Sequence, residues 1–204
     1  MTSTVGKLLR TASDAGLHHD IRTIWQAYEV AEQAHRGQRR ISGDRYISHP
    51  VEVATIVAGH GGTAPAVCAA LLHDVMDDDA AAVPASHLRR LFGCEVAGMV
   101  EDMAAQHIRS EYGVSRGVML VTLADRLHNL RTLRRLPAAS RRRASLDTLE
   151  FHVPMAHQLK ASAIAAEMSD LACAALGSLD GRSRKEPLFR RGPRHRDRPG
   201  PRDA

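Results

Sequence analysis

Residues 64–79 read APAVCAALLHDVMDDD, and this stretch gives the strongest indication of the fold. Its first nine residues are apolar, and a histidine and four aspartates then occupy five of the next seven positions. The apolar run predicts a buried helix from Ala64 to about Asp78. A solvated acidic helix end explains some of the aspartates, but it does not explain His73 and Asp74 directly behind two leucines. The stretch therefore indicates a buried helix that delivers polar groups to a site completed by residues elsewhere in the chain.

Helical patterns continue on both sides of this stretch. Apolar residues recur at helical spacing from Ile21 until Gly37, and Pro50 stands where a helix begins, with glycines ending that segment. Further helices are expected at about 86–93, 95–103, 118–136, 140–152 and 154–176. No segment alternates convincingly between apolar and polar residues, so the sequence predicts an all-α fold.

The length of 204 residues favours one domain followed by a tail. We expect a helical lead-in at 1–20, the domain at 21–178, and a disordered basic tail, rich in Arg, Pro and Gly, at 179–204. Residues 181–204 hold nine Lys or Arg against three Asp or Glu, whereas the rest of the chain holds 19 against 20. The domain itself therefore has no charge signature for nucleic acid, and only the tail offers a weak electrostatic attraction to it.

The three cysteines, Cys68, Cys94 and Cys173, are odd in number and widely spaced. Because they also stand among apolar residues, this pattern favours reduced thiols in the core over a disulfide framework or a zinc site, and it indicates a cytoplasmic protein. No stretch approaches the roughly 20 apolar residues that span a bilayer, so no membrane association is expected. The sequence leaves the oligomeric state open.

Polar residues elsewhere complete the candidate site. His49 stands at the start of a predicted helix, and Asp125 and Asn129 share one face of the leucine-rich helix near the middle of the chain. Adjacent helical residues such as His73 and Asp74 point about 100° apart, so they converge only on something between them, as a metal ion is. The imidazoles of His49 and His73 with two carboxylates form a mixed nitrogen and oxygen set suited to Mn²⁺, Fe²⁺ or Zn²⁺.

Further carboxylates strengthen the case for a cation. Asp77 and Asp78 follow His73 and Asp74 by four residues, which places them one turn further along neighbouring faces of the expected helix. Crowded carboxylates beside an apolar segment repel one another unless they are protonated or neutralised, and a divalent metal is the simplest neutraliser. A solvated acidic end is the alternative for this pair.

Five ordered segments of the chain resemble one known family. They are HRGQRRISGDRYISHPVEVATIV, AALLHDVMDDD, LFGCEVAGMVED, VTLADRLHNLRTL and DTLEFHVPMAHQL. Together they resemble the HD-type hydrolase domain of the RelA/SpoT homologue family, which includes the small alarmone hydrolases. The resemblance covers about residues 21–176 and is far more specific than an isolated His-Asp pair.

The resemblance implies an α-helical HD fold that holds Mn²⁺ and hydrolyses guanosine tetra- or pentaphosphate at its 3′ end, with release of pyrophosphate. The residues that match the family's metal positions are His49, His73, Asp74 and Asp125. Asp77 and Asp78 match its acidic pair, which activates and orients the attacking water.

The remaining matches concern the nucleotide. Asn129 and Thr132 match positions beside the ribose and phosphates, with Asn129 also counted in the catalytic set, and Arg40 matches the arginine that packs near the guanine. His128, by contrast, is interpreted as structural. Arg141 to Arg143 are interpreted as a solvated basic face, with attraction of phosphates as the alternative.

Three departures from the family pattern keep other functions open. Asp77 stands where Glu is usual, Ile41 and Arg45 replace a basic residue and a proline, and the segment from Asp102 to Val118 is shorter than in the family. A carboxylate retracted by one methylene, about 1.5 Å, can lower a rate about 100-fold. The alternatives are an HD domain that senses nucleotide without turnover, and an HD hydrolase of another nucleotide such as NADPH. The sequence contains nothing that resembles the family's synthetase motifs.

Overall fold

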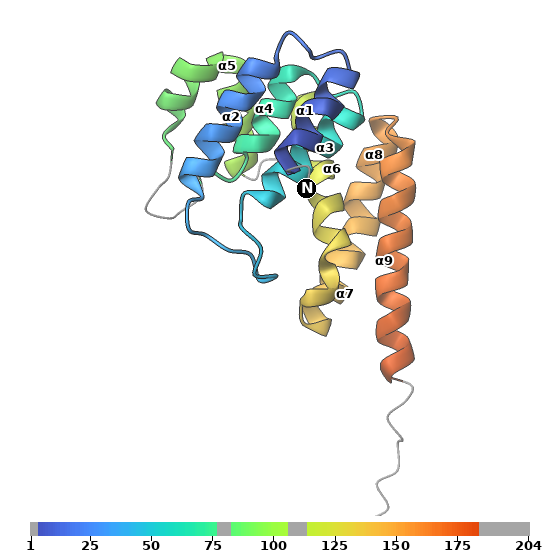
Figure 1. The fold of residues 1–204 in the computed structure, drawn as a ribbon. Helices are drawn as coiled ribbons and strands as arrows, with labels where there is room; N and C mark the ends of the chain where they lie inside the picture. Colours follow the sequence, from blue (N-terminus) through green and yellow to red (C-terminus); the bar gives the residue numbers. More distant parts are fainter. Residues whose placement is uncertain (1–3, 77–82, 106–113, 184–204) are drawn as a thin grey trace, which may run out of the picture.

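The structure is a computed structural model that describes residues 4–76, 83–105 and 114–183. In these ranges every regular element is helical, and the only β-type pairing is an isolated bridge between Arg39 and Arg45. The all-α expectation is confirmed. Figure 1 shows the first five helices gathered at one end, with α7, α8 and α9 alongside.

The first part of the chain forms a layer of five helices around the apolar stretch. They are α1 (Thr4–Asp14), α2 (Ile21–Ala34), α3 (Ser48–Gly59), α4 (Ala64–Leu72) and α5 (Ala85–Ala104). The short α4 lies at the centre, in contact with α2, α3 and α5. Helix α1 packs on α3 and fully buries Leu8 and Ala12, so the predicted lead-in is part of the packed body.

The second part adds α6 (Arg116–Arg131), a 3₁₀ turn η2 (Leu133–Arg135), α7 (Ala138–Asp147), a π-helical turn η3 (Thr148–His152), α8 (Val153–Gln158) and α9 (Ser162–Ser183). Helix α6 connects the two parts, because it contacts α3, α4 and α5 on one side and α8 and α9 on the other. Its residues therefore reach both the first helical layer and the later helices.

Helix α4 is buried because all its sides are apolar. A capping hydroxyl of Thr63, which accepts a hydrogen bond from the Ala66 amide, marks its start, and Pro65 lies in its first turn. Helix α4 contacts α3 and α6, its alanines leave room for such close packing, and its Leu71 and Leu72 are fully buried. The position of α4 in the core fixes the direction in which its C-terminal end points.

Some predicted boundaries were wrong. Helix α4 ends at Leu72, and residues 73–76 form a turn, so the expected helix from Ala64 to Asp78 is too long. The expected helix at 154–176 is two helices, because Lys160 adopts a left-handed φ of 59° between them. The expected break near Gly93 is confirmed, since Gly93 has a φ of 82° inside α5.

Helix α9 continues to Ser183, beyond the boundary at 178 that the sequence predicts, and the tail from 184 onward lies outside the described residues. Cys68 is buried, but Cys94 and Cys173 are exposed, so the expectation that all three cysteines lie in the core was wrong for two of them. Among the described residues, no helix has the length and apolar character needed to cross a membrane.

Candidate metal centre and adjoining cavity

Two histidines face each other where α3 begins and α4 ends. His49 lies in the first turn of α3, and His73 is the C-cap residue of α4. Their side chains are 5% and 6% exposed, and their ring centroids are 5.2 Å apart. Two imidazoles buried this deeply need polar partners, because an unpaired buried nitrogen is costly.

The partners are the two predicted carboxylates. Asp74 follows His73 directly, and its Oδ1 lies 3.1 Å from His73 Nε2. Asp125, from the middle of α6, places Oδ1 3.0 Å from His49 Nε2 and 3.9 Å from His73 Nε2. The structure therefore brings together all four residues that the sequence predicts as metal ligands, from three separate helical regions.

This arrangement fits a divalent cation. Ligand atoms of His49, His73 and Asp74 all lie within 4.8 Å of one another, and Asp125 adjoins both imidazoles. His73 Nδ1 lies 2.9 Å from the Ala70 carbonyl, which requires the proton on Nδ1 and leaves Nε2 facing the carboxylates. That buried Nε2 makes no hydrogen bond, although Asp74 Oδ1 is near, so its direction suits a ligand between the side chains.

The charges in the cluster are strongly coupled. Burial alone would lower the pKa of His73, but the Asp74 contact and the charge of Asp125 outweigh it and raise the pKa to about 9. Burial would raise the pKa of both carboxyl groups, yet their histidine partners hold both values below the usual range. Without metal, the cluster therefore retains two carboxylates and a protonated His73 near neutral pH.

Tyr46 is a part of this site that the sequence interpretation missed. Its hydroxyl donates a 2.8 Å hydrogen bond to Asp74 Oδ2, and its ring lies between the rings of His35 and His49. Burial, then the charge of Asp74, raises the pKa of Tyr46, so the phenol stays protonated and remains a donor. Its place three residues before His49 was the available signal in the sequence.

His128 is the second residue whose place the sequence did not reveal. Its Nδ1 lies 2.8 Å from His49 Nδ1 and 3.2 Å from Arg40 Nη1. Burial, followed by the charges of His49 and Arg40, lowers the pKa of His128 to about 4. His128 follows Asp125 by three residues on α6, and this helical spacing was the signal that could have placed it at the cluster.

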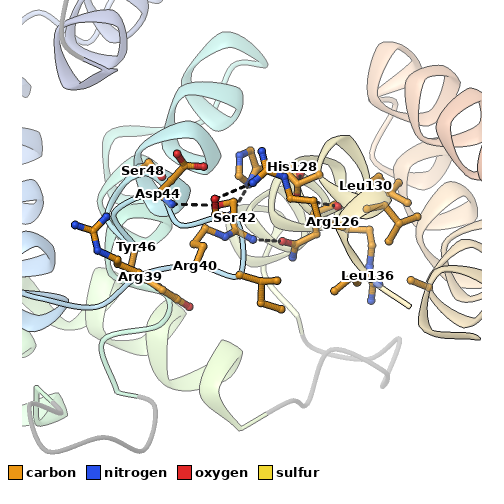
Figure 2. Close-up of a pocket in the computed structure, with 16 residues that line it drawn as sticks. Arg39, Arg40, Ser42, Asp44, Tyr46, Ser48, Arg126, His128, Leu130 and Leu136 are labelled. Carbon is orange, nitrogen blue, oxygen red and sulfur yellow. Dashed lines mark hydrogen bonds between the residues drawn. The ribbon is translucent and has the colours of Figure 1, made fainter. Parts of the chain in front are cut away.

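A cavity of about 520 Å³ adjoins the cluster, and its volume is typical of small-molecule sites. Figure 2 shows that it lies between the loop before α3 and the C-terminal half of α6. Its described lining holds four arginines and one aspartate, which are Arg39, Arg40, Arg126, Arg135 and Asp44. Because guanidinium groups pair well with phosphate oxygens, this lining suits an anionic, phosphorylated ligand.

The loop that forms one wall is fastened to α6 and η2. Gly43 has a φ of 87° and lets the chain reverse, and the bridge between Arg39 and Arg45 closes the turn. Across the cavity, Arg135 Nη1 donates a 2.9 Å hydrogen bond to the Ser42 carbonyl. A hydrogen bond between residues that are distant in the sequence therefore connects the two sides of the cavity opening.

The predicted nucleotide-contacting residues all lie on this cavity. Arg40 Nη2 donates to Asn129 Oδ1 at 3.0 Å, and Asn129 Nδ2 donates to Asp125 Oδ1 at 2.9 Å. Thr132 ends α6 and directs its hydroxyl to the carbonyl of Asn129 at 3.2 Å. Arg40, Asn129 and Thr132 thus form a wall that runs from the cavity mouth to the candidate metal ligand on α6.

Two residues that depart from the family pattern, Ile41 and Arg45, lie in the loop beside this cavity. Ile41 is 81% exposed and lines the cavity, while Arg45 turns away to pair with Glu32 at 2.9 Å. Asp77 and Asp78 lie outside the described residues, so their role remains a prediction.

Comparisons with known proteins identify relatives of this chain. Residues 27–113 match the family described as HD domain. The chain is 39% identical over 175 residues to a protein of Escherichia coli named bifunctional (p)ppGpp synthase/hydrolase SpoT, which covers 76% of this chain and 24% of that protein. It is 38% identical over 172 residues to a GTP pyrophosphokinase of Streptomyces antibioticus, covering 76% of this chain and 20% of that protein.

A third relative is the guanosine-3′,5′-bis(diphosphate) 3′-pyrophosphohydrolase of Haemophilus influenzae, 39% identical over 164 residues, with 72% of this chain and 24% of that protein covered. The chain thus spans a quarter or less of the length of these curated relatives. A solved structure described as a metazoan orthologue of SpoT that hydrolyses ppGpp shares the fold, with a TM-score of 0.57 at 23% identity, covering 79% of this chain and 95% of that one.

Proposed function

Since the chain belongs, through its HD domain, to the RelA/SpoT homologue family, we propose that it is a metal-dependent phosphohydrolase that removes the 3′-pyrophosphate from guanosine 3′,5′-bis-pyrophosphates. The observation that carries this proposal is that two features of the structure lie next to each other. Four potential ligands converge at one point, and a cavity lined by arginines opens directly beside them. Phosphate hydrolysis needs both an activated water and cations that offset charge on the phosphate oxygens.

The candidate ligands of the metal are His49, His73, Asp74 and Asp125, and the metal proposed for them is Mn²⁺. A bound divalent metal lowers the pKa of water toward neutrality and polarises phosphate oxygens. Nitrogen from two imidazoles and oxygen from two carboxylates suit Mn²⁺, although the same set accepts Fe²⁺ or Zn²⁺. Four protein ligands leave room for water and substrate on a metal that takes six.

Three cavity residues are proposed to bind the nucleotide. Arg40 packs near the guanine, and Asn129 with Thr132 orients the ribose and phosphates beside the ligand Asp125. Asn129 lies within hydrogen-bond distance of both Arg40 and Asp125, so it is suited to fix the distance between base and reacting phosphorus.

Asp77 and Asp78 complete the proposal as the groups that accept the proton of the attacking water and orient it. The support is their position in the sequence, three and four residues beyond the metal ligand Asp74. Asp77 is one methylene shorter than the Glu usual in the family, so we expect a slower reaction rather than a different one. The proposed location is the cytoplasm, in keeping with three unpaired cysteines.

The test is release of pyrophosphate from guanosine tetraphosphate by the purified chain, with Mn²⁺ and with a chelator. We expect release that requires Mn²⁺, and a loss of at least 100-fold in Asp125→Asn. Asp170→Asn, at an exposed position on α9, is the matched control and should retain full activity.

Three other outcomes are distinguishable. If guanosine tetraphosphate binds but no pyrophosphate is released, the result supports an HD domain that senses nucleotide without turnover. If the chain releases phosphate from NADPH in a metal-dependent way but none from guanosine tetraphosphate, the result supports another nucleotide as substrate. Full activity in Asp125→Asn contradicts the assignment of the site.

A further inference from the structure

Arg40, His128 and His49 form a continuous chain from the cavity to the candidate metal centre. The guanidinium Nη1 of Arg40 lies 3.2 Å from His128 Nδ1, and that same nitrogen lies 2.8 Å from His49 Nδ1. Both hydrogen bonds involve Nδ1 of His128, so the positions of the protons on these three side chains depend on one another.

The donor and acceptor roles follow from the chemistry of the three groups. A guanidinium has only N–H donors, so His128 Nδ1 must accept from Arg40 and must carry no proton. His49 Nδ1, which faces the same unprotonated nitrogen, must then be the donor. The imidazole of His49 is thereby left with Nε2, 3.0 Å from Asp125 Oδ1, as the nitrogen available to a metal.

We infer that His128 is a positioning residue that sets the tautomer and ring orientation of His49 for metal binding, and that Arg40 holds His128 in the accepting form. The inference rests on the metal centre of the proposed function. A histidine ligand in other metalloproteins donates its second N–H to a carboxylate, a backbone carbonyl or water, and His73 does so here with Ala70. Among the described residues, the hydrogen-bond partner of His49 Nδ1 is His128, so a neutral imidazole takes the place usually held by an oxygen.

Hydrogen bonds that start from Arg40 also connect the cavity to candidate metal ligands on two helices. Nη1 of Arg40 reaches His49 of α3 through His128, and Nη2 reaches Asp125 of α6 through Asn129. A single side chain on the cavity wall therefore supports both ligands. Metal binding is expected to depend on His128 even in the absence of any nucleotide.

The experiment measures Mn²⁺ affinity by titration calorimetry, without substrate, in the full chain and its variants. His128→Leu removes the acceptor and should weaken Mn²⁺ binding about 10- to 100-fold. His128→Asn places an amide oxygen close to the position of Nδ1, and it should restore affinity to within about threefold. His60→Leu is the matched control, because His60 Nδ1 also bonds inside the chain, to the Ile56 carbonyl at the far end of α3, and its loss should leave affinity unchanged.

A second measurement needs no substitution. In wild-type chain labelled with ¹⁵N-histidine and loaded with diamagnetic Zn²⁺, long-range proton–nitrogen spectra should show the His49 proton on Nδ1 and His128 without a proton on Nδ1. The inference is overturned if His49 carries its proton on Nε2, if His128→Leu binds Mn²⁺ as tightly as wild type, or if His128→Asn fails to restore binding in a chain whose helical circular dichroism is unchanged. A wild-type chain that binds neither Mn²⁺ nor Zn²⁺ would instead refute the metal centre itself, and this inference with it.

Discussion

The raised pKa of His73 makes metal binding strongly dependent on pH. An imidazole must be neutral to ligate a metal, so the proton on His73 competes with the cation. Because the Asp74 and Asp125 charges outweigh burial and raise the pKa to about 9, this competition extends through neutral pH and ends only above 9. The metal-free pair of His73 and Asp74 is correspondingly most stabilising below the ordinary histidine pKa of 6.5 and loses this contribution as the pH rises through 9.

The expected size of the effect follows from the fraction of neutral His73. Between pH 6.5 and pH 8.5 that fraction rises about 80-fold for a pKa of about 9, which corresponds to about 3 kcal/mol of apparent binding free energy. With the ordinary pKa of 6.5, it would rise only about twofold over the same range. Anaerobic calorimetric titration of the full chain with Mn²⁺ across this range measures the difference directly.

The same titration in buffers of different ionisation enthalpy counts the protons released. We expect about one proton per metal near pH 7.5, with a binding constant that rises nearly tenfold per pH unit. An affinity that stays within about threefold from pH 6.5 to 8.5, with no proton released, would refute the coupling of His73 to its carboxylate neighbours.

Three further predictions concern the surroundings of the centre. Tyr46→Phe removes the donor to Asp74 and should weaken Mn²⁺ binding about tenfold by calorimetry. Tyr28→Phe, at a tyrosine of α2 that interacts with Trp25 and Glu32, should leave the affinity unchanged, and equal affinities of the two variants would contradict the role of the Tyr46 phenol. Leu123→Ala empties a fully buried position on α6 and should lower the free energy of unfolding in urea by about 2–5 kcal/mol, and a change below about 1 kcal/mol would mean that α6 is not packed as described. Arg135→Met removes the hydrogen bond to the Ser42 carbonyl, so it should speed amide hydrogen exchange in residues 39–46 and lower the free energy of unfolding by about 1 kcal/mol or less. Unchanged exchange in these residues would show that this contact does not hold the loop.

Much of the helical core was predictable because its signal is local. The apolar run before His73 identified the central buried helix, and Pro50 marks a helix start in both sequence and structure. The position of Gly93 likewise predicted the break in α5. The left-handed turn at Lys160 was not predictable, since nothing in the residue type favours that conformation and only the packing of α8 and α9 against each other explains it.

Some residues of the candidate site were likewise predictable from the sequence and others were not. Residues that match a motif, such as His73 and Asp125, were found from the sequence, and the structure places them together. Tyr46 and His128 were missed because each contacts a candidate ligand that is distant in the chain, 28 and 79 residues away. Helical spacing could have placed His128 near the cluster through Asp125, but the contact with His49 depends on how α3 and α6 pack, which spacing does not specify.

The most direct test of the central claim is a crystal structure of the chain soaked with Mn²⁺, with diffraction recorded at the manganese absorption edge. The account predicts one strong anomalous peak in contact with Nε2 of His49 and of His73 and with the carboxylates of Asp74 and Asp125. No peak there at saturating Mn²⁺, or a peak bound by other residues, would contradict it.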